Sequence, residues 1–316
     1  MMSISKPNNS NTPNIYNDQQ NTVGTPAIRA YLGGSFDPVH NGHLEVAMSV
    51  YQCLLPLAAQ QQRALHVSLL PNARSPFKAH STDPSHRLAM LTLATQGTPI
   101  QINELELWQP PPVYTIDSVR TLRQRYPNDT LIFIMGMDSA RSLDKWKDGL
   151  QLTDYVDLWV FNRQNDSAVS DIDIAPTATS TALPIKRTEP LHNKSNLAAQ
   201  LPIPLQPYVI DSPAALLEAG IPSLLPKSAC PNLKTPSQGR IYIDLRPITA
   251  VSSTQIRQQL IDMSNKTAGA RKQIASVASI NDIIDNTHAN PLTKWLNPAV
   301  YRYIIAHQLY SAAQFR

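Results

Sequence analysis

Short apolar runs alternate along the chain with segments whose apolar residues recur at helical spacing. Five runs predict strands: Ile28–Leu32, Leu65–Leu70, Ile100–Ile102, Leu131–Met135 and Val156–Phe161. Four segments between them predict helices: Leu44–Leu57, Pro84 to about Thr95, Thr115–Tyr126, and one that begins near Asp138. Strands that are apolar on both faces are typical of a parallel sheet covered by helices on both sides. The pattern therefore predicts an α/β fold built on a doubly wound parallel sheet.

Two stretches interrupt this alternation. Residues 1–26 are rich in Asn, Thr, Ser and Gln and lack periodicity, so we expect a disordered N-terminal tail. Residues 164–239 hold 11 of the 27 prolines and have weak periodicity. Strand character resumes at Ile241–Leu245, and a helix is predicted from about Ser253. We expect one domain over 27–316, interrupted by a Pro-rich, partly disordered insertion at 164–239 that contributes little to the core.

Composition narrows the class of protein. Lys and Arg exceed Asp and Glu by only four and form no basic run, which argues against a nucleic-acid-binding surface but suits a small anionic ligand. The two cysteines, Cys53 and Cys230, fit neither a disulfide framework nor a metal site, which favours a reducing, cytoplasmic compartment. No stretch approaches the roughly 18 consecutive apolar residues of a membrane span.

Glycine is scarce, yet three of the ten glycines fall in one loop, Gly33–His43 (GGSFDPVHNGH). The loop follows the first predicted strand and leads into the first predicted helix, where open α/β sheets bind their ligands. Glycines let backbone amides approach a phosphate, and a helix N-terminus adds positive potential. His40 and His43, three residues apart, can both face such an anion. The glycine spacing is neither a dinucleotide fingerprint nor a P-loop.

Two other interpretations of this loop stay open. It could be a tight turn followed by a helix-facing histidine, with no ligand. The histidines could also bind zinc, but the sequence shows no obvious third ligand.

A second phosphate-binding element is predicted about 210 residues later, at Val251–Arg257 (VSSTQIR). A serine or threonine would cap the helix, and Arg257 lies one turn further on a compatible face. Alone this pattern is a weak signal because it is common, whereas paired with the histidine loop it is a strong signal for a site that binds an anion.

Several motifs carry a family resemblance when taken together. Besides the two above, they are Ser75–Lys78 (SPFK), Tyr114–Ser118 (YTIDS), Gly136–Ser139 (GMDS), Asp144–Trp146 (DKW) and Val300–Tyr310 (VYRYIIAHQLY). The chain resembles the nucleotidyltransferase superfamily with His-x-Gly-His and Ile-Ser-Ser-Thr-x-Ile-Arg motifs, and within it the bacterial nicotinate-nucleotide adenylyltransferase family. The motifs occur in the family's order and span most of the chain outside the tail and the insertion.

The resemblance implies a fold and a reaction. The fold is the Rossmann-like nucleotidyltransferase domain. The reaction, a step of NAD biosynthesis, joins ATP and nicotinate mononucleotide to give deamido-NAD and pyrophosphate with Mg²⁺. The attacking phosphate oxygen is already ionised at neutral pH, so alignment and charge neutralisation suffice. The implied partners are these two small molecules, with neither nucleic acid nor membrane.

The resemblance also implies roles for individual residues. His40, His43 and Arg257 would act on the ATP phosphates, and Ser253 and Thr254 would hold the outer phosphates. The remaining ATP and phosphate contacts would come from Gly33, Gly34, Ser35, Phe36, Lys78 and Asp138. Thr115 and Trp146 would bind the nicotinate half. The residues themselves leave alternatives: a helix cap for Asp138 or Thr115, a buried anchor for Trp146, and a solvated lysine for Lys78.

The sequence departs from the family pattern at three places. Ser75–Lys78 replaces the usual Pro-Pro-His-Lys, Arg163 is followed by Gln164 rather than by Pro-Gly, and residues 262–290 form a longer link to the last helix.

Rival functions remain at this point. They are adenylyl or cytidylyl transfer to phosphopantetheine or a phospho-alcohol, use of nicotinamide mononucleotide, and a non-catalytic nucleotide-sensing or scaffold role for the Pro-rich insertion.

Overall fold

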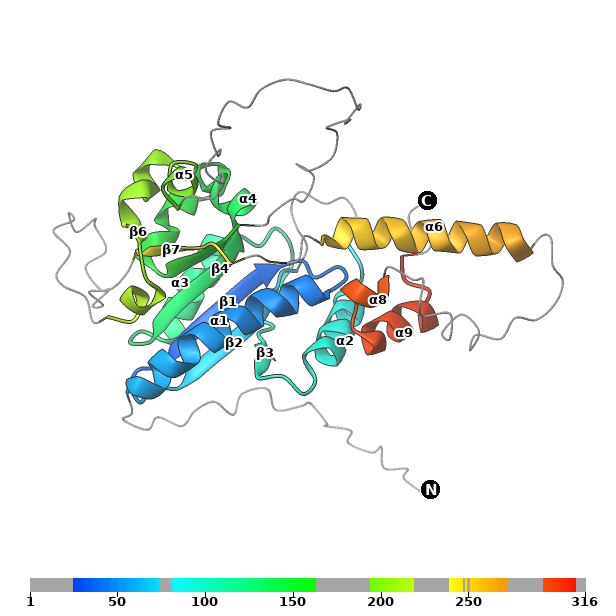
Figure 1. Cartoon of the computed structure of the whole chain (residues 1–316), viewed down its shortest axis with the longest axis horizontal. Helices are drawn as coiled ribbons and strands as arrows, with labels where there is room; N and C mark the ends of the chain where they lie inside the picture. Colours follow the sequence, from blue (N-terminus) through cyan, green and yellow to red (C-terminus); the bar gives the residue numbers. More distant parts are fainter. Residues whose placement is uncertain are drawn as a thin grey trace, which may run out of the picture.

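Seven parallel strands form the centre of the protein, in the order β3-β2-β1-β4-β5-β7-β6. The structure is a computed structural model, and it describes residues 25–73, 81–162, 194–218, 239–246, 248, 251–271 and 292–310. The strands are β1 (Ile28–Gly34), β2 (Leu65–Pro71), β3 (Ile100–Ile102), β4 (Thr130–Gly136), β5 (Asp157–Phe161), β6 (Val209–Ile210) and β7 (Ile241–Asp244). The predicted α/β fold with a doubly wound parallel sheet is confirmed (Figure 1).

The helices of the described residues are α1 (Asn41–Gln60), α2 (Pro84–Thr95), α3 (Thr115–Arg125), α4 (Met137–Ala140), α5 (Lys194–Ala198), α6 (Ser253–Arg271), α8 (Leu292–Trp295) and α9 (Pro298–Ala306). Helices α1 to α4 and α6 lie where the sequence predicts helices, whereas α5 lies in the insertion and was not predicted. Short 3₁₀ turns include η1 (Leu143–Lys145), η2 (Gly149–Asp154), η4 (Ile203–Tyr208) and η5 (Pro213–Leu216). Asp83 caps α2 by accepting a hydrogen bond from the Ser85 N–H at 2.8 Å, and Pro84 takes the first helical position.

The strands bury alternate residues on opposite faces of the sheet. Ile132 and Ile134 of β4 pack into one core with α1, α2, α6, α8 and α9, whereas Phe133 and Met135 pack into another with α3, α4 and α5. Side chains that alternate with a period of two reach both layers, which is why these runs are apolar throughout.

The direction in which strands are added reverses between β1 and β4. From β1 the sheet grows through β2 to β3, and from β4 it grows through β5 to β7 in the opposite direction. The carboxyl ends of β1 and β4 therefore lie on either side of a crevice, the place where open α/β sheets bind ligands.

Part of the insertion is packed, which corrects one expectation. Leu197, Leu201 and Leu205 are buried in one core, and Leu216 and Leu217 in the other. Strand β6 pairs in parallel with β7, with Val209 opposite Ile241. The expectation that 164–239 contributes little to the core is therefore wrong for residues 194–218. Leu197, Leu201 and Leu205 are spaced by four, as on one face of a helix, but the many prolines around them masked this pattern in the sequence. The rest of the insertion, apart from its last residue, and nearly all of the predicted tail lie outside the described residues.

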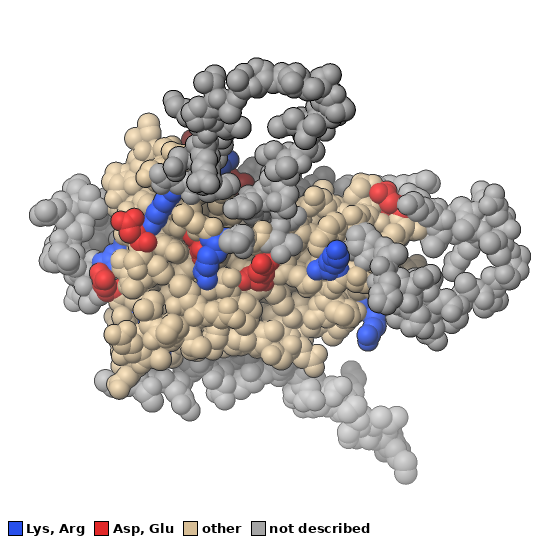
Figure 2. Space-filling view, viewed as in Figure 1, with Lys and Arg blue, Asp and Glu red and all other residues tan. Residues whose placement is uncertain are grey.

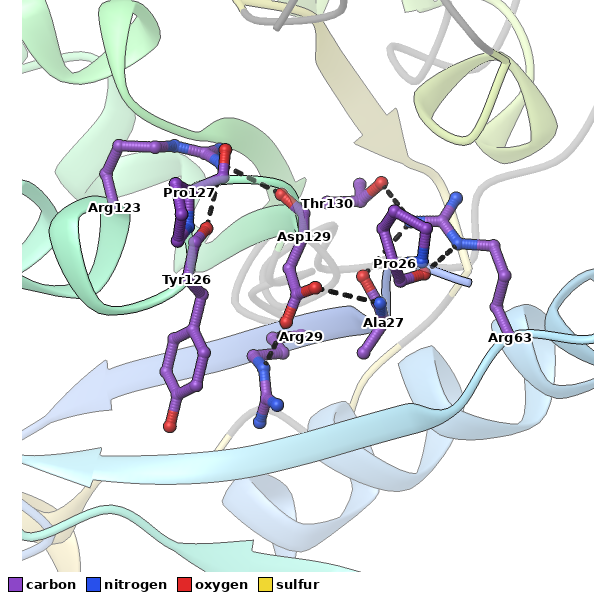
Figure 3. A network of polar contacts seen from close by, with 9 residues as sticks. All are labelled: Pro26, Ala27, Arg29, Arg63, Arg123, Tyr126, Pro127, Asp129 and Thr130. Carbon is purple, nitrogen blue, oxygen red and sulfur yellow. Dashed lines mark hydrogen bonds and ion pairs between the residues drawn. The ribbon is translucent and has the colours of Figure 1, made fainter. Parts of the chain in front are cut away.

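Polar contacts join β1 and β4 at their amino ends (Figure 3). The Asp129 carboxylate accepts hydrogen bonds from the Ala27 N–H at 2.9 Å and from Arg29 Nε at 2.6 Å. Arg63 reaches the same edge and donates to the Ala27 carbonyl at 3.0 Å and to Thr130 Oγ1 at 2.6 Å. These contacts hold β1 and β4 in a fixed register. They therefore also fix the positions of the carboxyl ends of the two strands on either side of the crevice.

The surface carries few charges. On the face in Figure 2, Lys and Arg side chains lie singly and near Asp and Glu side chains, with wide uncharged areas between them. None of the helices in the described ranges combines the length and apolar character needed to cross a bilayer.

Candidate active site

The loop after β1 is shaped by close contacts at its two glycines. A Cβ atom on Gly33 would lie 2.6 Å from Cζ of Phe133, and one on Gly34 would lie 3.2 Å from Cζ of Phe36. Phe36 is fully buried and has a φ of 47°. Its ring therefore belongs to the core.

His40 and His43 come together at the start of α1. His40 is the N-cap residue, is 4% exposed, and donates its backbone N–H to His43 Nδ1 at 3.2 Å. The two imidazole rings stack with centroids 3.6 Å apart, and Phe36 packs edge-on against His43. Because His43 Nδ1 accepts a hydrogen bond, a neutral His43 carries its proton on Nε2. The capping contact thus selects the tautomer that can donate from Nε2 to a phosphoryl oxygen.

The predicted second element contacts this loop directly. Ser253 Oγ donates to the Pro38 carbonyl at 2.9 Å, and Arg257 donates to the Asp37 carbonyl at 2.5 Å. Arg257 also donates to Thr254 Oγ1 at 3.0 Å. The first turn of α6, with its N–H groups and Arg257, therefore lies beside the start of α1.

Helix α6 begins with a side-chain cap one residue before Ser253. Ser252 Oγ accepts the Gln255 N–H at 3.2 Å, and Gln255 Oε1 accepts the Ser252 N–H at 2.9 Å. This reciprocal pair is a capping box, which leaves Ser253 available to bond the loop.

Gly42 lies close to the segment that leads into α6. A Cβ atom on Gly42 would lie 3.0 Å from Val251 Cγ1 and 3.2 Å from His40 Nδ1. A larger residue would therefore crowd both side chains, which is a physical reason for the glycine between the two histidines of the motif.

A small hollow marks the crevice between β1, β4 and β5. It is lined by residues from the carboxyl ends of these strands and from the two phosphate-binding elements: Leu32, His40, Gly42, His43, Val46, Met135, Gly136, Phe161, Ile248 and Val251. The histidines and the start of α6 therefore meet at the switch point of the sheet.

Asp138 lies at the same edge of the sheet. It is exposed in the first turn of α4, directly after β4. Gly136 occupies the N-cap position of this helix, so the Asp138 carboxylate is not its cap.

Thr115 and Trp146 belong to two segments that are in contact through Lys147. Thr115 is the first residue of α3, and Tyr114 rather than Thr115 is the N-cap. Lys147, next to Trp146, donates to Asp117 Oδ2 at 3.1 Å and lies 4.5 Å from the centre of the Tyr114 ring. Trp146 is half-buried and packs against the core, so it is both anchored and partly accessible.

The sequence patterns did not reveal Arg87, whose side chain bonds the backbone of the loop after β1. Arg87 is fully buried and donates to the Ser35 carbonyl at 3.0 Å, the Asn72 carbonyl at 2.7 Å and the Ala73 carbonyl at 2.5 Å. It thereby ties the loop after β1 to the end of β2. The available signal was an arginine on the apolar stripe of α2. Lys78 lies outside the described residues.

The fold and this arrangement define a class of protein. A glycine loop, two helix N-termini, imidazoles and a guanidinium at the switch point of a parallel sheet are the features of a Rossmann-like nucleotidyltransferase domain. The sequence profile described as cytidylyltransferase-like matches residues 31–259, and the chain belongs to this family.

Individual relatives are similar to different extents. A probable nicotinate-nucleotide adenylyltransferase of Idiomarina loihiensis is 28% identical over 242 residues, which cover 74% of this chain and 88% of the relative. The nicotinate-nucleotide adenylyltransferase of Bacillus subtilis is 42% identical over 119 residues, 36% of this chain and 58% of the relative. The match thus spans little more than half of the Bacillus subtilis protein.

One solved structure has a weaker likeness. It is the Plasmodium falciparum nicotinic acid mononucleotide adenylyltransferase complexed with NaAD. The structural alignment covers 90% of this chain and 97% of the Plasmodium falciparum chain, with a TM-score of 0.49 and 16% sequence identity.

Proposed function

We propose that the protein transfers the adenylyl group of ATP to nicotinate mononucleotide, giving deamido-NAD and pyrophosphate in NAD biosynthesis. The observation that carries this proposal is the direct contact between the two phosphate-binding motifs, Ser253 to Pro38 and Arg257 to Asp37, beside His43 at the switch point. The names of the Idiomarina loihiensis and Bacillus subtilis relatives support the choice of acceptor.

The reaction needs alignment rather than a protein nucleophile. A phosphate oxygen of nicotinate mononucleotide attacks the α-phosphorus of ATP, and a P–O bond forms in line with the bond to the leaving pyrophosphate. Negative charge builds on the α-phosphoryl oxygens and on the departing bridging oxygen. Preorganised donors aimed at that charge lower the barrier, and each contributes most in the transition state.

The chain supplies such donors from two helices. His43 would donate from Nε2 to the α-phosphate, with His40 stacked against it. Arg257, Ser253 and Thr254 would contact the outer phosphates at the start of α6, and Gly33, Gly34 and Ser35 would admit the phosphates close to the backbone. Asp138, after β4, would face the adenosine.

A divalent cation fits this set of residues if it arrives with ATP. In the described part of the chain no group of three or more His, Cys, Asp or Glu side chains is arranged to hold a metal. Mg²⁺ is commonly held by substrate phosphates with few protein ligands and keeps several waters. Mg²⁺ would neutralise charge on the triphosphate, while the residues above orient it.

The nicotinate half would bind between the start of α3 and the loop that carries Trp146. A ring stacked on the exposed part of Trp146 would place the carboxylate toward the backbone N–H groups near Thr115, where the helix N-terminus favours negative charge. The neutral amide would gain less from this potential, so we expect a clear preference for the acid.

A pyrophosphate-release assay with a panel of acceptors tests the proposal. The panel comprises nicotinate mononucleotide, nicotinamide mononucleotide, phosphopantetheine and a phospho-alcohol, each with Mg-ATP or Mg-CTP. We expect the highest kcat/KM with Mg-ATP and nicotinate mononucleotide. Equal or better use of the amide would refute acid specificity, and release only with another acceptor would refute the proposed substrate. Binding of ATP without release would favour a nucleotide-sensing role.

A further inference from the structure

The last described residue of the chain contacts the middle of the phosphate-binding loop. Tyr310 is fully buried, and its hydroxyl donates to Asp37 Oδ1 at 2.6 Å. Asp37 is 4% exposed and precedes His40 by three residues. A residue 273 positions away in the sequence is therefore bonded to the loop that carries the histidines.

Asp37 has further bonds to two other segments. Its Oδ2 accepts the Thr82 N–H, just before α2, at 3.1 Å. Its backbone carbonyl accepts the Arg257 guanidinium at 2.5 Å. Asp37 thus joins the loop, the start of α2, the first turn of α6 and the end of the chain.

Both oxygens of the buried Asp37 side chain accept hydrogen bonds. A buried carboxylate is tolerated only where hydrogen bonds or charges compensate for lost hydration. Arg87, also buried, donates to the carbonyls of Ser35 and Thr82 and interacts electrostatically with Asp37. Burial and the nearby Asp37 charge raise the pKa of Tyr310 well above its usual value, so the phenol stays protonated and donates.

We propose that Tyr310 and Asp37 form a positioning pair, which holds His43 and Arg257 in the relative arrangement that adenylyl transfer requires. This inference rests on the proposed function. Neither residue needs to touch the substrate. The bond from Tyr310 fixes the Asp37 carboxylate, and the backbone of Asp37 fixes Arg257 on one side and leads into the histidines on the other. Small displacements of reacting groups lower rates steeply.

Tyr310→Phe tests this because it removes one hydroxyl and keeps the buried ring. With Mg-ATP and nicotinate mononucleotide we expect kcat to fall roughly tenfold or more, with KM for both substrates within about twofold. Tyr303→Phe is the matched control. It lies in the same C-terminal segment, and its hydroxyl bonds His86 Nδ1 at 2.8 Å instead of the loop. We expect its kcat to stay at the wild-type value.

A second variant addresses the coupling. Asp37→Asn replaces one carboxylate oxygen with an NH₂ group, which either opposes the Thr82 N–H or reverses the direction of the bond with the Tyr310 hydroxyl, so Tyr310 no longer meets a carboxylate. We expect Asp37→Asn to lower kcat more than Tyr310→Phe does. In the double variant the loss should be smaller than the product of the two single losses. Independent, multiplicative losses would contradict a pair.

An activity-independent readout separates this inference from the proposed function. In ¹⁵N-histidine-labelled full-length protein, the His43 signals, assigned with His43→Gln, should move in Tyr310→Phe and stay in place in Tyr303→Phe. Unchanged His43 signals, or a folded Tyr310→Phe variant with wild-type kcat, would overturn the positioning role. A wild-type protein that is inactive with every acceptor would refute the proposed function, while the spectra would still decide the positioning role.

Discussion

Two arginines at opposite ends of the parallel strands have different roles. Near the amino ends, Arg123 is buried and donates to the backbone carbonyls of Tyr126, Pro127 and Asp129 at 2.8–3.3 Å (Figure 3). It also donates to the Tyr155 carbonyl at 2.8 and 3.0 Å. At the carboxyl ends, Arg257 is only half-buried and bonds one carbonyl and the exposed Thr254. A buried guanidinium that donates to backbone carbonyls, like that of Arg123, stabilises the fold. A half-buried guanidinium at the rim of a crevice, like that of Arg257, is placed to bind an anion.

This comparison predicts a division of effects. Substitutions of the phosphate-facing residues at the rim of the crevice should lower kcat and leave the free energy of unfolding nearly unchanged. Substitution of Arg123 should do the reverse.

The largest effect is expected for His43→Ala. Loss of one preorganised donor costs on the order of 10²–10³ in kcat, because the contact strengthens as charge develops. ATP affinity should change far less, as measured by equilibrium binding beside steady-state kinetics. His66→Ala is the control, since His66 pairs opposite Arg29 near the amino end of the sheet. Near-normal kcat in folded His43→Ala would show that His43 only caps α1.

Arg123→Met should destabilise the protein without changing the chemistry. It leaves several partly buried carbonyls without their donor, which costs about 3 kcal/mol in the free energy of unfolding. Denaturant unfolding measures this loss, and kcat should stay within about twofold of wild type. Arg125→Met, an exposed position on the same helix, should be nearly neutral. A large loss of kcat in Arg123→Met would erase the distinction between the two ends.

Asp157, at the start of β5, makes stability depend on pH. Burial raises the pKa of the Asp157 carboxyl to about 7. The hydrogen bond that Asp157 Oδ1 accepts from the Arg240 N–H at 2.9 Å opposes this rise. Since an unfolded Asp has a pKa near 3.9, ionisation is disfavoured in the fold, and stability falls as pH rises from about 4 to about 7. Relative to Asp157→Asn, the wild type should lose about 2 kcal/mol between pH 5 and pH 8. If the free energy of unfolding changed with pH by the same amount in the wild type and in Asp157→Asn, Asp157 would not be the source of the pH dependence.

Arg257→Lys should have the smallest effect of the four. Lysine keeps the charge but cannot donate in two fixed directions, to the Asp37 carbonyl and to Thr254. We expect kcat to fall about tenfold, which corresponds to about 1.4 kcal/mol in the activation free energy. Arg302→Lys, exposed on α9, serves as the control. Full activity with lysine would mean that a point charge is enough.

The insertion shows where sequence patterns were ambiguous. Pro202 and Pro204 interrupt the helical spacing of Leu197, Leu201 and Leu205, yet those leucines are buried. The two-residue strand β6 is too short to produce an alternating pattern. Both features depend on an existing sheet, because β7 provides the edge and the apolar face on which they pack.

Local sequence determined the elements and the character of the site. A window of seven to twelve residues contains the whole pattern of a buried strand or an amphipathic helix, so β1, β2, α2, β3 and β4 could be predicted within one or two residues. The glycine loop and the Ser-Ser-Thr helix start are equally local. They predict that His40, His43, Ser253 and Arg257 meet a phosphate.

Contacts between distant segments were decided only by the tertiary structure. Arg87 beneath the loop, Tyr310 on Asp37, and β6 outside β7 all depend on which strands become neighbours and where each connection returns. An arginine or a tyrosine has the same local sequence signature whether its donors meet water or a buried acceptor. The physical reason is that hydrogen-bond partners and burial are properties of the packed chain, which no short window of sequence contains.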